Sequence, residues 1–169
     1  MKYWKYLKYI LKHKWYVAVE CFKVGLYLHA FTHDLSKFRP SEWIPYARYF
    51  YGEYPSWWSL PGDSRIQYFG LTKEIVSDAL DLAWLKHQKR NKHHWQYWVL
   101  HEDSGQTKTL FIPRKYLKQM ACDWIGASKA MRGKDATPIE WYGKVKNGTL
   151  MDESSRVEFE YLIGAEEGK

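Results

Sequence analysis

Apolar side chains recur at helical spacing over residues 3–31, and no other feature of the sequence restricts the fold as much. This period is typical of an amphipathic helix, so we predict one helix here, broken near Gly25. The residues that carry the period are Leu7, Ile10, Leu11, Trp15, Ala18, Cys21 and Phe22. Such a helix is most often the first element of a helical core, although its lysines would also suit a membrane surface.

The same segment excludes two targeting classes. Lysine interrupts each apolar step of MKYWKYLKYILKHKW, so the segment lacks the apolar core of a signal peptide. No run of about 18 uninterrupted apolar residues occurs, and no membrane span is expected. Cys21 and Cys122 lie among apolar neighbours, which is typical of buried free thiols in a reducing compartment. We therefore expect a cytoplasmic protein.

Turn and capping residues divide the rest of the chain into further helices and one hairpin. The predicted elements are a helix over 41–51 after Pro40, a loop over 52–70, a helix from Lys73 to about Tyr97 capped by Thr72, a hairpin over 97–112, a helix from Pro113 to about Ala130, a helix from the capping box Thr137–Glu140 to near Gly148, and a last helix over 154–166. The sequence thus predicts a mainly α fold, a single helical bundle domain over residues 1–169 with a small β-hairpin.

Charge and aromatic content indicate the kind of partner. The net charge is +7, which favours anionic partners such as nucleotides, phosphates or nucleic acid. The alternative explanation is a solvated, lysine-rich helix surface. Aromatic residues make up 18% of the chain and could serve an interface, a homodimer included, or a stacking surface. Trp57 and Trp58, in the predicted loop, could stack on a base or pack back onto the domain.

The adjacent pair His33 and Asp34 is the sharpest chemical signal. Imidazole nitrogen and carboxylate oxygen can bind the same divalent ion, and this ligand set accepts Mn, Fe, Co, Ni, Zn or Mg. Lys37 follows three residues after Asp34. A surface ion pair between Asp34 and Lys37 is the alternative interpretation of that spacing.

A second group of histidines lies near the end of the helix predicted from residue 72. On a helix His87, Asn91 and His94 would share one face, whereas His93 would point away and be exposed or lie behind the ligands. The neighbouring cations Lys86, Lys89, Arg90 and Lys92 would favour neutral imidazoles and attract phosphate. A basic, solvated helix end is the alternative.

Asp123 stands among apolar neighbours in QMACDWIGASK. Ionised carboxylates are rarely buried unless they are paired or bound to a metal, so we predict a ligand. The alternative is a surface pair with Arg114 or Lys129. His29 lies one turn before His33 and could reach the same face or simply pack, and His101 is expected at the surface.

The run His33-Asp34-Leu35-Ser36-Lys37 resembles the signature of the HD-domain superfamily of metal-dependent phosphohydrolases. That resemblance implies an HD-like helical bundle in which an earlier histidine, the His-Asp pair and a later aspartate bind one metal. Here His13 and Asp123 match the first and last of these positions. His87 and His94 match the histidines that bind a second metal or the substrate phosphate, so one or two ions are expected.

The chain also resembles a family of short phage and bacterial proteins through HKW, HDLSKF, HQKRNKHHWQYW and CDWIGASK. In two respects it departs from the HD pattern, because His13 precedes the pair by a short interval and Ser36 replaces a frequent glycine. The resemblance implies hydrolysis of a nucleotide or a related phosphate ester, in the host cytoplasm if a phage encodes the protein. Asp34, Lys37 and Arg90 would be catalytic, the two cations neutralising charge on the phosphate.

Three rival functions stay open at this point. A basic helical protein could bind nucleic acid through phosphate contacts and stacking, without turnover. Some HD-like folds hold two iron ions and oxidise their substrates. The third rival is a protein that keeps the fold but binds no metal at the site.

Overall fold

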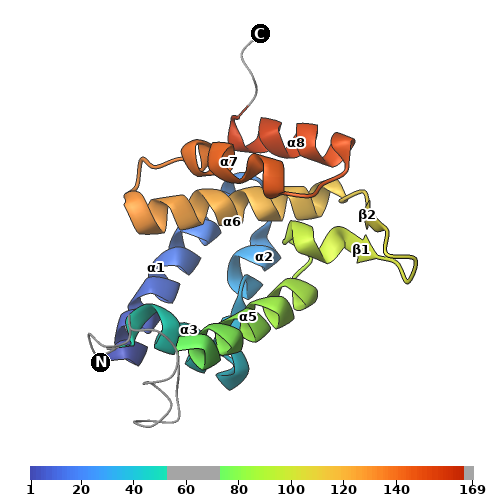
Figure 1. Ribbon diagram of the computed structural model, residues 1–169. Coiled ribbons are helices and arrows are strands. Elements are labelled where there is room, and N and C mark those ends of the chain that lie inside the picture. Colours follow the sequence, from blue (N-terminus) through green and yellow to red (C-terminus); the bar gives the residue numbers. More distant parts are fainter. Residues whose placement is uncertain (53–72, 166–169) are drawn as a thin grey trace. The chain divides into compact units, whose positions relative to one another are not determined.

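The computed structural model describes residues 1–52 and 73–165, which form helices and one small antiparallel sheet (Figure 1). The predicted mainly α fold with a hairpin is therefore confirmed. The elements are α1 (Lys2–Lys23), α2 (Tyr27–Thr32), η1 (Leu35–Phe38), α3 (Pro40–Tyr51), α5 (Lys73–Arg90), η4 (Trp95–Trp98), β1 (Val99–His101), β2 (Thr107–Thr109), α6 (Arg114–Arg132), α7 (Ile139–Val145), η5 (Lys146–Gly148) and α8 (Glu153–Ile163). The loop predicted over 52–70 lies almost entirely outside the described residues.

The chain forms two compact units, and each unit combines two separate stretches of sequence. Unit 1 consists of Met1–Ile10 and Asp34–His87, and unit 2 consists of Leu11–His33 and Gln88–Lys169. The chain thus passes from one unit to the other inside α1, at the His33–Asp34 peptide bond and inside α5. The single domain over residues 1–169 stays a prediction.

Aromatic side chains dominate the core of unit 1. Tyr6 packs against Trp43 and Tyr46, with ring centroids 4.9 and 6.0 Å apart. Ala47 of α3 and Ala83 of α5 complete this cluster, and both are buried. The part of α1 in unit 1 therefore packs through an aromatic face, which accounts for some of the tyrosine and tryptophan in the sequence.

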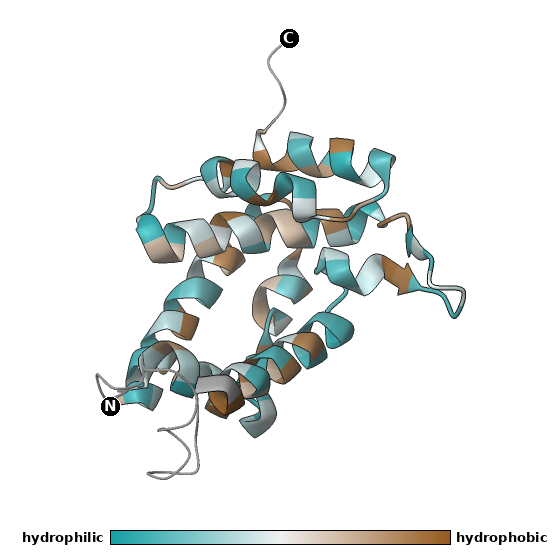
Figure 2. Cartoon of the chain, in the orientation of Figure 1, coloured by the Kyte–Doolittle hydropathy of each residue, from teal (hydrophilic) through white to brown (hydrophobic). Residues whose placement is uncertain are grey.

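The core of unit 2 is built on α6. Hydrophobic and hydrophilic residues are interspersed along α6 and α8 (Figure 2), as expected for helices with one buried face. Helices α7 and α8 lie along one side of α6 (Figure 1), and Leu117, Met120, Trp124, Tyr142 and Phe159 fill this contact.

A second cluster of unit 2 joins α6 to α1 at close range. A Cβ atom at Gly126 would lie 2.4 Å from Val17 Cγ2 and 2.8 Å from the Val17 amide nitrogen, so only glycine permits this approach. Cys21 and Cys122 are both buried free thiols in the same cluster, as predicted. This close packing fixes the middle of α6 against α1.

Several predicted boundaries are confirmed. Gly25 has φ +74°, in the left-handed region that favours glycine, and it separates α1 from α2. Pro40 stands at the start of α3, and Pro113 precedes α6. The hairpin pairs Val99 with Thr109.

Two expectations about helix ends are wrong. The helix expected to reach Tyr97 ends at Arg90, because the residues that follow turn away to place Trp95 and Trp98 against the α6–α8 core. The helix predicted at Thr137 does form, but Pro138 is its N-cap and no side chain caps it. The Thr137 carbonyl instead accepts a hydrogen bond from Arg132.

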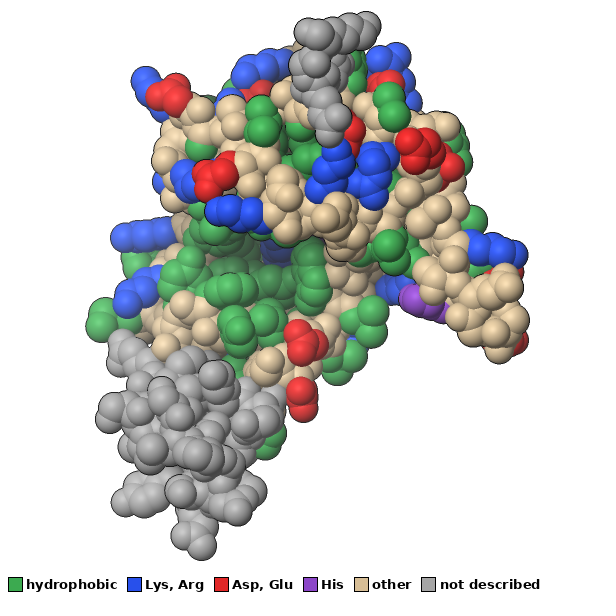
Figure 3. Space-filling model, turned by 45° about the horizontal axis from the view of Figure 1, so that its top comes forward, with side chains coloured by type: hydrophobic (Ala, Val, Ile, Leu, Met, Phe, Trp, Pro, Cys, Tyr) green, Lys and Arg blue, Asp and Glu red, His purple; other side chains and the backbone are tan. Residues whose placement is uncertain are grey.

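Surface charges of opposite sign lie side by side. Figure 3 shows Lys and Arg side chains among Asp and Glu side chains over the C-terminal helices. Arg114 pairs with Glu158 at 2.8 Å and Lys144 pairs with Glu140 at 2.9 Å. Among residues 1–52 and 73–165, no helix has the length and hydropathy that crossing a bilayer requires.

Candidate metal centre

Two helices of unit 2 supply the side chains that the sequence singled out as ligands. His13 lies on the buried face of α1, one turn before Val17 and two turns before Cys21. Asp123 lies on α6, between the buried residues Cys122 and Trp124. Since Gly126 holds α6 close to α1, these two helices bring His13 and Asp123 together although 110 residues separate them.

His33 completes this group from the end of α2. It is the C-cap residue of that helix, and its amide donates to the His29 carbonyl at 2.8 Å. Its own carbonyl accepts a hydrogen bond from the Lys14 ammonium on α1. These backbone bonds fix the position from which the His33 ring points into the interior, where it is 1% exposed.

The three side chains form a triangle of potential ligand atoms. The Nε2 atoms of His13 and His33 are 3.1 Å apart. Asp123 Oδ1 lies 3.1 Å from His13 Nε2 and 3.4 Å from His33 Nε2. Two ligand atoms about 2.1 Å from one ion are roughly 3.0–3.4 Å apart when the angle between them is about 90–109°. The edges of the triangle therefore match those of a single coordinated ion.

The pKa shift of Asp123 is also suited to a metal ligand, because it favours the ionised carboxylate. Burial raises the pKa of this carboxyl, but hydrogen bonds with His13 and His33 outweigh that effect and hold it well below its usual range. The carboxylate is thus ionised at neutral pH. The alternative of a surface pair with Arg114 or Lys129 is wrong, since both cations pair with other glutamates.

Two histidines without an assigned role in the sequence prediction lie beside the triangle. The rings of His29 and His93 are 5.2 and 4.8 Å from that of His33, between centroids. His93 Nε2 is also 4.0 Å from Asp123 Oδ2. The expectation that His93 points away is wrong, because α5 ends before it and the following turn directs its ring inward.

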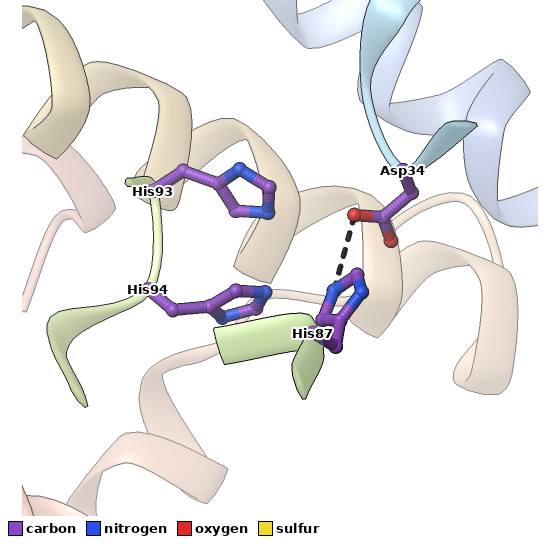
Figure 4. Close-up of side chains that lie close together, drawn as sticks. All are labelled: Asp34, His87, His93 and His94. Carbon is purple, nitrogen blue, oxygen red and sulfur yellow. Dashed lines mark ion pairs between the residues drawn. The ribbon is translucent and has the colours of Figure 1, made fainter. Parts of the chain in front are cut away.

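His94 is buried in unit 2 next to His93. Their ring centroids are 4.3 Å apart, and both rings extend to the same side of the chain (Figure 4). His87 belongs to unit 1. The helical face expected to unite His87, Asn91 and His94 does not exist, because only His87 of the three lies within α5.

Asp34 belongs to a cluster of polar side chains in unit 1, which we call the polar group of unit 1. Its members are Asp34, Lys37, Glu42 and His87. Asp34 has a φ of 55° and a ψ of 25°, which place it in the left-handed region, and it is the one non-glycine residue with positive φ in the described ranges. Such strain persists where surrounding contacts fix it and is common at functional sites. Asp34 is 1% exposed, and its Oδ2 accepts from Lys37 Nζ at 2.6 Å. The predicted pair with Lys37 therefore exists, but its carboxylate is buried and its lysine is half-buried, so it is not an exposed surface pair.

His87 lies between two carboxylates of unit 1. Its Nε2 is 3.3 Å from Asp34 Oδ1 (Figure 4), and its Nδ1 donates to Glu42 Oε2 at 2.8 Å. Burial lowers the pKa of this imidazole, but hydrogen bonds with Asp34 and Glu42 outweigh burial, and the net shift is upward. A carboxylate on Nδ1 orients the ring and directs Nε2 toward a proton or a metal.

Glu42 is a site residue that the sequence reasoning missed. It is completely buried in the first turn of α3, and Ser36 Oγ donates to its Oε2 at 3.0 Å. The position looked like an ordinary acidic helix start. The signal that could have identified it is its spacing of four residues from Tyr46, which puts it on the buried face of α3.

Arg90 and His101 are two further residues that the sequence analysis singled out. Arg90 is the last residue of α5 and is exposed, in unit 2. His101 is exposed in the hairpin, as expected, and its Nδ1 is 2.8 Å from Thr107 Oγ1. Trp57 and Trp58 lie outside the described residues.

Comparisons with known proteins give one result. No curated protein and no solved structure matches this chain. The HD-domain likeness of HDLSK is untested by these comparisons and stays a prediction. A family model described as a family of unknown function (DUF5662) matches residues 2–165. Because this match spans nearly the whole sequence, the chain belongs to the DUF5662 family.

Proposed function

We propose that the chain is a metal-dependent phosphohydrolase that acts on a nucleotide or a related phosphate ester. The observation that carries the proposal is the buried triangle of His13, His33 and Asp123, whose edges of 3.1–3.4 Å suit one divalent ion. Two imidazoles and a carboxylate occupy part of a coordination sphere and leave positions for water and substrate. The net basic charge of the chain suits an anionic substrate.

The three residues of the triangle, all in unit 2, have distinct roles in this proposal. A divalent ion supplies Lewis-acid chemistry, since it lowers the pKa of water and stabilises charge on a phosphoryl oxygen. The Asp123 carboxylate provides negative charge for the ion, and its low pKa keeps that charge over the neutral range. His13 and His33 provide neutral nitrogen donors, and Lys14 holds the His33 backbone in place.

The catalytic roles of Asp34 and Lys37, which belong to unit 1, rest on the sequence resemblance, and the contacts inside unit 1 are compatible with them. Lys37 carries the positive charge that would offset charge on a transferred phosphoryl group, and Asp34 orients it at 2.6 Å. Within the same unit, Glu42 orients the His87 ring through Nδ1, and Nε2 of that ring can hold a proton against Asp34. Further ligand roles for Asp34, His87 and His94, and the catalytic role of Arg90, stay part of the proposal on the strength of the sequence resemblance.

The test is a hydrolysis screen on the full chain. Nucleoside mono-, di- and triphosphates and cyclic dinucleotides would be incubated with metal-free protein to which Mg, Mn, Co, Ni or Zn is added. We expect phosphate or nucleotide release with at least one of these ions. Asp123→Asn should lower the rate at least about 1000-fold, roughly 4 kcal/mol of transition-state stabilisation, because it removes the charged ligand.

The matched control is Asp135→Asn, which makes the same substitution at an exposed aspartate of unit 2. It should retain the wild-type rate. The proposal would be overturned if Asp123→Asn kept metal-dependent turnover at the wild-type rate. It would also be overturned if wild-type protein, shown to contain bound metal, gave no turnover with any of these ions.

A second candidate function has one observation in its favour. Two histidines and one carboxylate around open positions are also the ligand set of non-haem iron oxygenases. Under this alternative the iron-loaded protein would consume oxygen in the presence of an organic substrate and release no phosphate. An oxygen electrode and a phosphate-release assay, both run on one sample of iron-loaded protein, separate the two functions.

A further inference from the structure

Three histidines of unit 2 form a group of potential ligand atoms, and the proposed function uses only one of them, His33. His29, His33 and His93 each present a ring nitrogen, and these nitrogens lie within 4.8 Å of one another. The ring of His29 is 5.3 Å from that of His93, so all three rings are neighbours. We infer that this group is a second cation site, with His33 common to both sites.

The spacing of the nitrogens fits one ion after small adjustments. Three atoms within 4.8 Å of one another fit inside a circle of radius about 2.8 Å, whereas bonds from imidazole nitrogen to zinc are ~2.0–2.1 Å. Each nitrogen therefore needs to move by at most roughly 0.8 Å. Rotations about the side-chain torsions of His29 and His93 supply shifts of that size without a change in the backbone.

The local backbone holds two of the three ligands at a fixed spacing. His29 and His33 are one helical turn apart at the end of α2, where the His33 amide bonds to the His29 carbonyl at 2.8 Å. His93 comes from the turn after α5. His33 and His93 are buried while His29 is half-buried, so the group is enclosed on the inside and reachable from the His29 side.

The chemistry of the ligands selects the kind of ion. Three imidazoles form a neutral nitrogen set, which suits Zn, Cu, Ni or Co and binds Mg poorly. His33 Nε2 already faces His13 and Asp123, so its Nδ1 is the atom for the second ion. When both ions are bound, the His33 ring gives up its N–H proton to solvent.

The test counts zinc ions per chain by equilibrium dialysis of metal-free full-length protein. We expect His29→Gln to bind one Zn²⁺ fewer than wild type, and Asp123→Asn also to bind one fewer. The double variant should lose two, because the two substitutions affect different sites. The control His101→Gln removes an exposed hairpin histidine and should bind as many ions as wild type. Circular dichroism verifies that each variant is folded.

Copper EPR identifies the ligands independently of the count. Asp123→Asn loaded with one Cu²⁺ should show hyperfine coupling to three nitrogens, and His29→Gln in that background should abolish the three-nitrogen pattern. An unchanged zinc count in His29→Gln overturns the inference. So does a double variant that loses no more than Asp123→Asn alone, since one ion would then serve all five residues. Neither result bears on hydrolysis at the first site, which the substrate screen tests.

Discussion

The polar groups of the two units use the same residue types in opposite arrangements. In unit 2 one carboxylate, Asp123, is contacted by two imidazoles. In unit 1 one imidazole, His87, is contacted by two carboxylates, Asp34 and Glu42, and Lys37 lies against the first of them. The first arrangement offers donor atoms around a single negative charge, which is suited to an external cation.

The second arrangement balances its own charge. A protonated His87 and Lys37 together offset Asp34 and Glu42, and the upward shift of the pKa of His87 favours that protonated form. The comparison teaches that a buried cluster of histidine and carboxylate is not by itself a metal site. Two carboxylates around one imidazole raise the pKa of that imidazole and favour a bound proton in metal-free protein, whereas two imidazoles around one carboxylate leave nitrogen donors for a cation.

Removal of Glu42 should affect unit 1 most strongly. Glu42→Ala leaves His87 and Ser36 without their buried acceptor, and breaking a buried charge pair costs about 3–5 kcal/mol of unfolding free energy. Urea denaturation measures the loss. The matched control is Glu140→Ala, an exposed acidic residue in the first turn of α7, which should change little. A loss for Glu42→Ala no larger than for the control would show that unit 1 does not depend on this contact.

Metal should stabilise the protein through unit 2. At 100 times the dissociation constant a bound ion adds about 2.7 kcal/mol, or a rise in Tm of roughly 5–11 °C for a chain of this size. Differential scanning fluorimetry with Mn²⁺ and with EDTA measures the rise. It should persist in Glu42→Gln and shrink strongly in Asp123→Asn. A rise lost in the Glu42 variant but kept in the Asp123 variant would reverse the assignment of the two units.

The close approach of α1 and α6 should matter for unit 2. Gly126→Ala forces the new Cβ into Val17, and overpacking of this kind costs about 1–3 kcal/mol. Because it separates His13 from Asp123, it should also weaken metal binding, measured by titration calorimetry. Gly143→Ala on α7 meets no atom within 4 Å and is the control. Metal affinity that stays at the wild-type value in Gly126→Ala would show that this helix contact does not set the ligand spacing.

The stability of metal-free protein should respond to pH with opposite signs in the two units. The pKa of His87 is raised on folding, so its stabilisation is complete below the unfolded pKa near 6.5 and is lost as the pH rises through the folded pKa. The pKa of Asp123 is lowered, so its stabilisation is present above about pH 4 and is lost as the pH falls.

Denaturant titrations from pH 3 to pH 9 measure both slopes, which should be the smallest effects of the set, on the order of 1 kcal/mol each. His87→Gln should flatten the decline at high pH and leave the acid decline unchanged. Asp123→Asn should do the reverse. Flattening of the same slope by both variants would contradict the contrast between the units.

The sequence singled out His33 through the adjacent His-Asp pair, Asp123 through its apolar neighbours, and His13 through the HD-domain resemblance, and the structure brings these three side chains together. Helical spacing predicted the direction of His93 wrongly. The helix that carries His87 ends at Arg90, and that end depends on Trp95 and Trp98 packing against α6 and α8, which are distant in sequence. Long-range packing of this kind overrides local helical preference and has no signal in the local pattern.

The burial of Glu42 and the left-handed backbone of Asp34 also depend on tertiary structure and could not be predicted from the sequence. An acidic residue in the first turn of a helix is typical of a solvated position, and only the packing of α3 in unit 1 shows that Glu42 is completely buried. The positive φ of Asp34 follows from the turn between α2 and η1. The element types and most boundaries could thus be predicted, whereas the residues that orient His87 required the tertiary structure.

The most direct test of the central claim is the number of Mn²⁺ ions bound per chain, read from the EPR signal of free Mn²⁺ during a titration. Mn²⁺ accepts the mixed nitrogen and oxygen triangle of His13, His33 and Asp123 and disfavours an all-imidazole site. The account predicts that wild type and Asp135→Asn each bind one Mn²⁺ ion per chain. His13→Gln and Asp123→Asn should bind none. Equal binding by Asp123→Asn and wild type, or no binding by wild type, would contradict it.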